Sequence, residues 1–82
     1  MITKIINNSE YEILAQETID LTGQHRYLLT SKTFHYPVYV VWYQTPNGFF
    51  YPHKFTDINK ARADYHFRLA QAYAPNVKIE RK

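Results

Sequence analysis

The sequence predicts an α+β domain, an antiparallel meander sheet of about four strands with one long C-terminal helix packed on one face. Two observations predict this architecture. Runs of β-branched and aromatic residues, Val38–Tyr43 and Phe49–Phe55, flank Pro46-Asn47-Gly48, as in two strands joined by a turn. The segment after Asp57 is rich in good helix formers until Pro75.

The composition indicates one small domain that spans residues 1–82. There are no cysteines, so neither disulfides nor thiolate metal sites are expected. No apolar stretch approaches the roughly 20 residues that a membrane span needs, and we expect a cytoplasmic protein without membrane contact. Net charge is 10 − 7 = +3, and the cations are spread thinly.

The first third of the chain can be interpreted in two ways. Residues 1–9 would form a short edge strand or a packed arm. In residues 10–31 apolar side chains recur at period two around Gly23, which favours two strands with a bulge near Ala15-Gln16. The alternative is a helix over residues 10–20, because Ser9 and Glu12 match the capping-box pattern.

The central hairpin is expected to have a three-residue loop closed by a bulge at Gly48. If Thr45 opposes Phe49, side chains alternate between two faces and the helix packs on the more apolar one. That face would carry Tyr39, Val41, Tyr43, Phe49, Tyr51, His53 and Phe55, and the other face would carry Val38, Val40, Trp42, Gln44, Phe50 and Lys54.

The helix is expected to begin after an N-cap at Asp57 and to end at Pro75-Asn76. Phe67 points away from its apolar stripe. Val77 and Ile79 would form a short final strand. At 100° per residue the stripe that faces the sheet consists of Ile58, Ala61, Tyr65, Leu69 and Ala72.

No pattern in the sequence points to catalysis. The four histidines lie on different elements without metal-ligand spacing, and the acidic residues are dispersed. Both glycines occupy turn positions, so a glycine-rich phosphate loop is excluded. We therefore expect no catalytic residues, no metal, no cofactor and no enzymatic activity.

The aromatic fraction of 17% and the two-sided hairpin favour a protein-binding surface. The sheet face away from the helix would expose aromatic side chains beside a cation, unless the N-terminal segment covers it or Trp42 belongs to the core. Self-association is also predicted, through this sheet face or through the off-stripe apolar residues of the helix, Ala63, Phe67, Ala70 and Ala74. The residues expected to bind a partner are Trp42, Phe50, Lys54, Val40 and Phe67.

The pattern YVVW…GFFY…HKF, followed by Asp57, Ala61 and Tyr65 at helical spacing, resembles small uncharacterised proteins of phages and plasmids in Gram-positive bacteria. The match covers about Tyr36 to Leu69. The resemblance implies a stoichiometric inhibitor or regulator of host machinery, for which anti-CRISPR proteins are the familiar example, and a partner among host defence or regulatory proteins.

The alternative function is binding of RNA or single-stranded DNA, with aromatic side chains as stacking platforms. Were residues 10–20 helical, the order α-β-β-β-α would be similar to the double-stranded-RNA-binding fold, although the basic cluster that opens the second helix of that fold is missing. The phosphate contacts would be Arg26, Lys32, Lys54 and Arg62.

Overall fold

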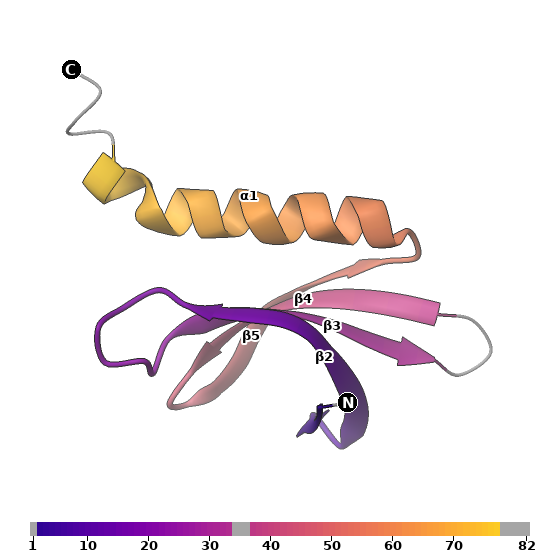
Figure 1. The fold of residues 1–82 in the computed structure, drawn as a ribbon. Helices are drawn as coiled ribbons and strands as arrows, with labels where there is room; N and C mark the ends of the chain where they lie inside the picture. The colour runs from indigo at the N-terminus through magenta and orange to yellow at the C-terminus, as the bar shows by residue number, and fades with distance from the viewer. Residues whose placement is uncertain (1, 34–36, 78–82) are drawn as a thin grey trace.

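The computed structural model describes residues 2–33 and 37–77, which form a sheet with one helix above it (Figure 1). The predicted α+β meander with a C-terminal helix is confirmed, and the sheet has five strands because the N-terminal segment adds one. No helix in the described ranges is long and apolar enough to cross a membrane. The elements are β1 (Thr3–Ile6), β2 (Ser9–Thr18), β3 (Arg26–Thr33), β4 (Pro37–Thr45), β5 (Gly48–Phe55) and α1 (Ile58–Val77).

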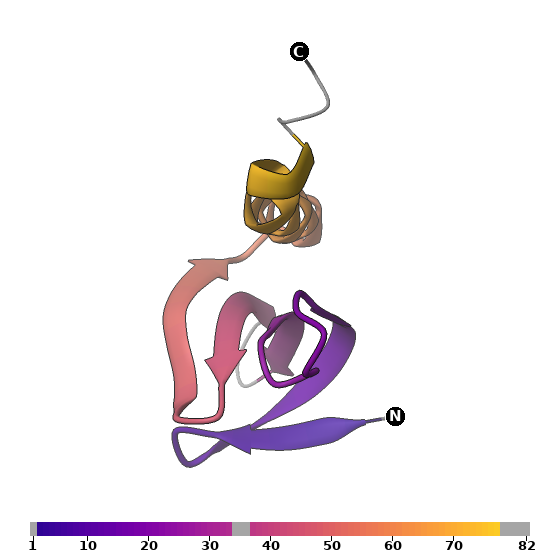
Figure 2. The same ribbon diagram turned by 90° about the vertical axis from the view of Figure 1, so that its left-hand side faces the viewer.

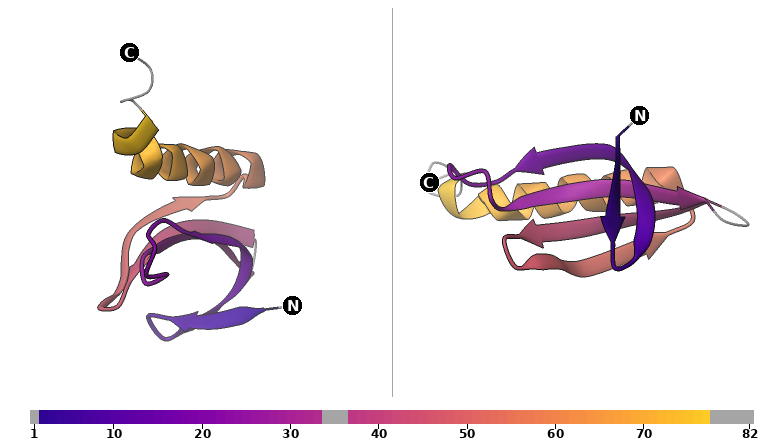
Figure 3. Two further views of the ribbon diagram at one scale, coloured as in Figure 1. Left: turned by 60° about the vertical axis from the view of Figure 1, so that its left-hand side comes forward. Right: turned by 90° about the horizontal axis from the view of Figure 1, so that it is seen from below.

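The strands pair in sequence order, and every neighbouring pair is antiparallel. Residues 10–18 belong to β2, so the strand interpretation of this segment is confirmed and the helical alternative is wrong. The bulge lies between Ile13 and Ala15, slightly earlier than predicted, and leaves Leu14 unpaired in the register. The sheet curls strongly along β2, and β1 passes beneath the other strands (Figures 2 and 3).

The helix side of the sheet holds one of two cores, which we call the upper core. The predicted stripe is correct, because Ala61, Tyr65 and Leu69 are buried and Ile58 is half-buried. Phe67 is 60% exposed on the opposite side of the helix, as predicted. The buried residues of the upper core are Leu29, Val41, Ala61, Tyr65 and Leu69, with Ala15, Ile19, Tyr27, Tyr39 and Phe55 packed against them.

The predicted start of the helix is confirmed, and its predicted end is wrong. Asp57 caps the N-terminus, because its carboxylate Oδ1 accepts a hydrogen bond from the Asn59 amide at 2.8 Å. The helix runs through Pro75 to Val77, so the predicted end at Pro75-Asn76 is wrong. Val77 is therefore helical and does not start a strand, while Ile79 lies outside the described residues.

The opposite side of the sheet holds the lower core. The solvent-facing surface expected here is wrong, and the alternative, that the N-terminal segment covers this face, is confirmed. Trp42 is only 4% exposed and Val40 only 1%, although both were expected on a solvent-facing surface. The cause is the curl of the sheet, because β1 and the first half of β2 cover this face. The buried residues of the lower core are Ile6, Tyr11, Leu28, Val40 and Trp42, with Ile13, Val38 and Phe49 packed against them.

The hairpin register also differs from the prediction at its tip. Thr45 opposes Gly48, so the loop has two residues rather than three, and Phe49 and Phe50 exchange faces. Further along, Tyr51 and Pro52 together oppose the single residue Trp42 in a β-bulge. The extra residue restores the predicted faces for the remainder of β5, from His53 to Phe55.

Candidate functional site

A group of aromatic side chains lies on the side of the sheet that faces the helix, which we call the upper face. The group is at the end of the sheet that carries the β2–β3 loop and the β4–β5 turn. Tyr43 is at its centre, with ring centroids 5.1 Å from Tyr27, 6.3 Å from His25 and 6.2 Å from Tyr51. Phe50 extends the group, 6.2 Å from Tyr51. These five residues, here called the aromatic row, come from β3, its preceding loop, β4 and β5.

Tyr51 is the least ordinary member of the aromatic row. Its φ of 55° lies in the left-handed region, where a side chain with a Cβ is strained. It occupies the first position of the bulge, which glycine commonly takes when this residue is left-handed. The strained backbone places a ring that is 69% exposed beside Phe50, which is 40% exposed.

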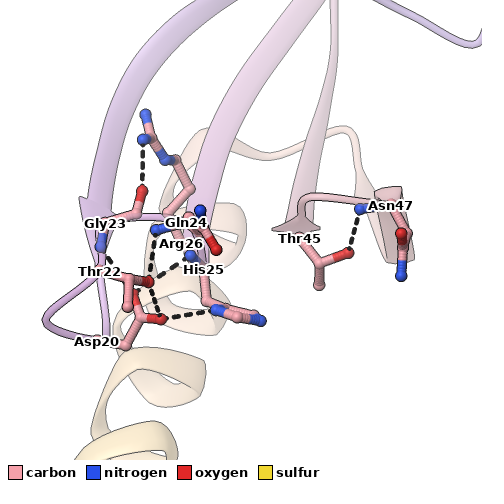
Figure 4. Close-up of polar contacts among 8 residues, drawn as sticks. All are labelled: Asp20, Thr22, Gly23, Gln24, His25, Arg26, Thr45 and Asn47. Carbon is pink, nitrogen blue, oxygen red and sulfur yellow. Dashed lines mark hydrogen bonds and ion pairs between the residues drawn. The ribbon is translucent and has the colours of Figure 1, made fainter.

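The β2–β3 loop next to the row is ordered by Asp20 (Figure 4). Its carboxylate accepts hydrogen bonds from the Thr22 hydroxyl at 2.7 Å, from the Gly23 amide at 3.1 Å and from the His25 amide at 3.3 Å. The His25 ring Nδ1 lies 2.7 Å from Asp20 Oδ2. Leu21, between these anchored residues, is fully exposed at a relative accessibility of 106%.

The same contacts set the charge at this end of the sheet. The hydrogen bond from Thr22 does most to lower the pKa of Asp20, to about 2; slight burial acts in the opposite direction, and His25 lowers it further. Asp20 is therefore ionised at neutral pH. Burial raises the pKa of Tyr43, and the neighbouring Tyr27 and Asp20 raise it further, so this phenol stays neutral.

Arg68 borders the row on the helix side. Its guanidinium lies 5.1 Å from the Tyr27 ring centroid, and Nη1 donates a hydrogen bond to the Val41 carbonyl at 3.1 Å. Asp64 stands 3.9 Å from Arg68 Nη1 and 3.0 Å from His53 Nδ1. Arg68 is buried, and sequence reasoning did not identify it as a core residue.

The structure does not bring the predicted partner-binding residues onto one surface. Phe50 lies in the aromatic row, whereas Trp42 and Val40 are buried in the lower core. Lys54 is exposed on the lower face of β5, opposite Val40 in the register, and Phe67 is exposed on the far side of the helix.

The predicted nucleic-acid contacts are also dispersed. Arg26 donates to Gln16 Oε1 at 3.1 Å and to the Gly23 carbonyl at 2.9 Å. Lys32 donates to Ser9 Oγ at 3.0 Å and lies 5.6 Å from the Tyr11 ring centroid. Both cations are on the lower side, Lys54 is on β5 and Arg62 on α1. Within the described ranges no three histidine or acidic residues form a group that could hold a metal ion.

Sequence reasoning missed Leu21 and Tyr51 as candidate contact residues. The sequence contained an indication of the unusual position of Tyr51, because Pro52 inside an otherwise regular strand indicates an edge strand or a bulge. Leu21 had a weaker one, since Asp20, Thr22 and Gly23 together are typical of an ordered turn with a solvent-facing residue inside it. We call Leu21, Phe50 and Tyr51 the loop-end surface.

No protein-family model, curated protein or solved structure matches this chain. The candidate site is therefore defined by geometry alone, at the loop end of the sheet.

Proposed function

We propose that this chain is a non-enzymatic protein-binding module that contacts its partner through the loop-end surface. The supporting observation is Tyr51, a strongly exposed aromatic side chain held in a left-handed backbone conformation. Such a conformation costs roughly 1–3 kcal/mol and persists only where the surrounding structure imposes it. Strain of this kind is concentrated at functional sites, and a glycine would remove it.

The exposure of the Tyr51 ring also supports a protein contact at this surface. Tyr27 and Tyr43 are half-buried and contribute to packing, whereas Tyr51 at 69% exposure buries little surface of its own. A partner that covers Tyr51 and Leu21 gains about 25 cal/mol per Å² of apolar surface removed from water. Tyrosine is also one of the residue types that dominate the energetics of protein interfaces.

The charges beside the aromatic row favour a protein partner over a nucleic acid. Asp20 is ionised next to Tyr43, and a carboxylate there repels phosphate. The cations that a nucleic acid would need do not share one surface. Arg26 and Lys32 are engaged in other contacts on the lower side, Lys54 lies on the lower face of β5, and Arg62 lies on the helix. A host regulatory or defence protein is the partner class that the resemblance to phage and plasmid proteins implies.

The test is affinity capture from lysate of the native host with the full chain and two variants. Tyr51→Gly removes the exposed ring and relieves the positive φ, so this variant should fold at least as stably as the wild type. Phe67→Ala is the matched control, because it removes an aromatic ring of similar exposure on the far side of the helix. We expect proteins that the wild type and Phe67→Ala retain and that Tyr51→Gly loses.

Nuclease treatment and salt separate the two classes of partner. An apolar protein interface should survive both nuclease and moderate salt, whereas phosphate contacts weaken steeply as salt rises. Equal capture by Tyr51→Gly and the wild type would eliminate the loop-end surface as the contact. Capture that is lost only in Phe67→Ala would transfer the interface to the outer side of α1.

A further inference from the structure

Three buried polar atoms on the lower side of the sheet have no hydrogen-bond partner in the described part of the chain: Arg26 Nε, Trp42 Nε1 and Gln44 Oε1. Buried polar groups in folded proteins are nearly always paired, so a group of unpaired ones requires an explanation. Trp42 is only 4% exposed, and its indole N–H cannot be satisfied by bulk water.

The three atoms belong to neighbouring positions on one face. Arg26 on β3 is the direct register partner of Gln44 on β4. Trp42 lies two residues before Gln44, so alternation places both side chains on the lower face. The cluster therefore forms the end of the lower core nearest the loops. Arg26 and Gln44 are half-buried as whole residues, whereas the three unpaired atoms are themselves buried.

The two nitrogen atoms of the cluster are donors that suit an anion. The other guanidinium nitrogens of Arg26 donate to two neutral acceptors, Gln16 Oε1 and the Gly23 carbonyl (the latter in Figure 4). Arg26 Nε and Trp42 Nε1 are both N–H donors. Gln44 Oε1 is an acceptor as it stands, and rotation of the Gln44 amide would replace it with a third donor. A second cation borders the lower core, since Lys4 Nζ lies 5.8 Å from the ring centroid of Phe49, which packs against that core.

We propose that Arg26, Trp42 and Gln44 form a binding site for one carboxylate group. Hydrogen bonds from a guanidinium to a carboxylate are shorter and stronger than those between neutral groups, and a planar carboxylate can accept from two N–H donors at once. The carboxylate comes from a small free acid or from a partner's side chain or C-terminus. This site is on the opposite face from the aromatic row and does not depend on the proposed contact through Tyr51.

The single tryptophan of the chain makes the site directly observable. Its indole N–H gives one cross-peak in a ¹H–¹⁵N spectrum, and that proton reports on any new hydrogen bond. We would titrate the full chain with sodium acetate and, at matched ionic strength, with sodium chloride. We expect a saturable downfield shift of the indole proton with acetate and none with chloride.

Arg26→Met is the main variant, because it keeps an unbranched apolar stem and removes the guanidinium donors. Its affinity for acetate should fall at least tenfold, while its thermal unfolding remains cooperative. If Arg26→Met does not fold, Gln44→Leu is tested for the same loss. No saturable shift in the wild type, an equal response to chloride, or unchanged affinity in the folded variants would overturn the proposal.

Two blocked tripeptides distinguish the sources of the carboxylate. One carries a glutamate side chain and an amidated C-terminus, and the other has a free C-terminus and no acidic side chain. Tighter binding of either peptide than of acetate would assign the site to that carboxylate of a partner. Saturable binding of acetate alone would assign it to a small free acid.

Discussion

The two faces of the sheet are buried by different means. The upper core is covered by a separate element, the 20-residue helix α1, which places Ala61, Tyr65 and Leu69 against the strands. The lower core is covered by the sheet itself, because β2 bends at the bulge next to Ile13 and brings β1 beneath β4 (Figure 3). One face therefore depends on helix amphipathicity, and the other depends on the curvature of a single strand.

The two cores also differ in whether their buried polar groups have hydrogen-bond partners. In the upper core the buried Arg68 donates to the Val41 carbonyl and lies over Tyr27. In the lower core Thr30 is paired with the Val40 carbonyl at 2.9 Å, but the unpaired atoms of Arg26, Trp42 and Gln44 remain. Among the described residues, the self-covered face thus has one unsatisfied end, where we place the carboxylate site.

The largest expected effect tests whether the lower core is as well packed as the upper one. Trp42→Ala should destabilise the fold by about 3–5 kcal/mol, because it removes an indole that contacts the Tyr11 and Phe49 rings at 5.8 and 6.0 Å between centroids. Chemical denaturation measures the change, and Trp42→Phe, which keeps an aromatic ring, should cost much less. A Trp42→Ala variant of wild-type stability would mean that β1 does not cover this face in solution.

The corresponding truncation in the upper core is Leu69→Ala. We expect a loss of about 2–5 kcal/mol, since Leu69 is only 6% exposed between helix and sheet. Phe67→Ala, two residues earlier on the helix, should change stability by only about 0.5 kcal/mol, as exposed substitutions usually do. Equal losses at both positions, measured in the same denaturant series, would show that the helix is buried on two sides.

The elements themselves could be predicted because their signals are local. The helix stripe and the strand character of β4 and β5 follow from the spacing and type of neighbouring residues, and these assignments are correct. The covering of Trp42 was foreseen only as an alternative that the sequence could not decide, because it depends on how far β2 bends at Leu14 and on where that bend carries Ile6. Such a contact joins residues far apart in the sequence, and local periodicity carries no information about it.

The candidate site was predicted only at Phe50, and for the wrong reason. Phe50 was expected beside Trp42, but a loop shorter by one residue transfers it to the face of Tyr43. The bulge at Tyr51 then shifts the alternation of side chains by one residue again. The error in the predicted loop length therefore assigned wrong faces only to residues at the hairpin tip. Pro52 signalled the irregularity, but the left-handed conformation of Tyr51 depends on its pairing opposite Trp42.

An intermediate effect is expected at the buried guanidinium of the upper core. Arg68→Met retains the apolar stem over Tyr27 and removes the N–H donor to the Val41 carbonyl, which should cost roughly 1–3 kcal/mol. Asp64 also loses its nearby cation. Thermal or chemical unfolding measures the change. An Arg68→Met variant more stable than the wild type would show that desolvation of the guanidinium outweighs its contacts.

The smallest effect concerns the loop beside the aromatic row and depends on pH. The pKa of Asp20 is lowered from 3.8 to about 2, with the Thr22 hydroxyl as the largest cause, so the folded state favours the ionised carboxylate. The resulting stabilisation is fully present above a pH of about 4 and is lost as the pH falls through about 2. Asp20→Asn lacks this titration and should show a flatter dependence of melting temperature on pH across that window.

The measurement is a series of thermal melts from about pH 5 to about pH 1.5 on the wild type, Asp20→Asn and Leu21→Ala. Leu21→Ala is the control, because it alters the same loop without removing a titratable group and should follow the wild-type slope. The advantage of the wild type over Asp20→Asn should shrink as the pH falls, since protonation removes the charge that the Thr22 and His25 donors stabilise. Parallel curves for all three proteins would mean that the Asp20 contacts do not persist in solution, and the ordered loop beside Tyr43 would have to be abandoned.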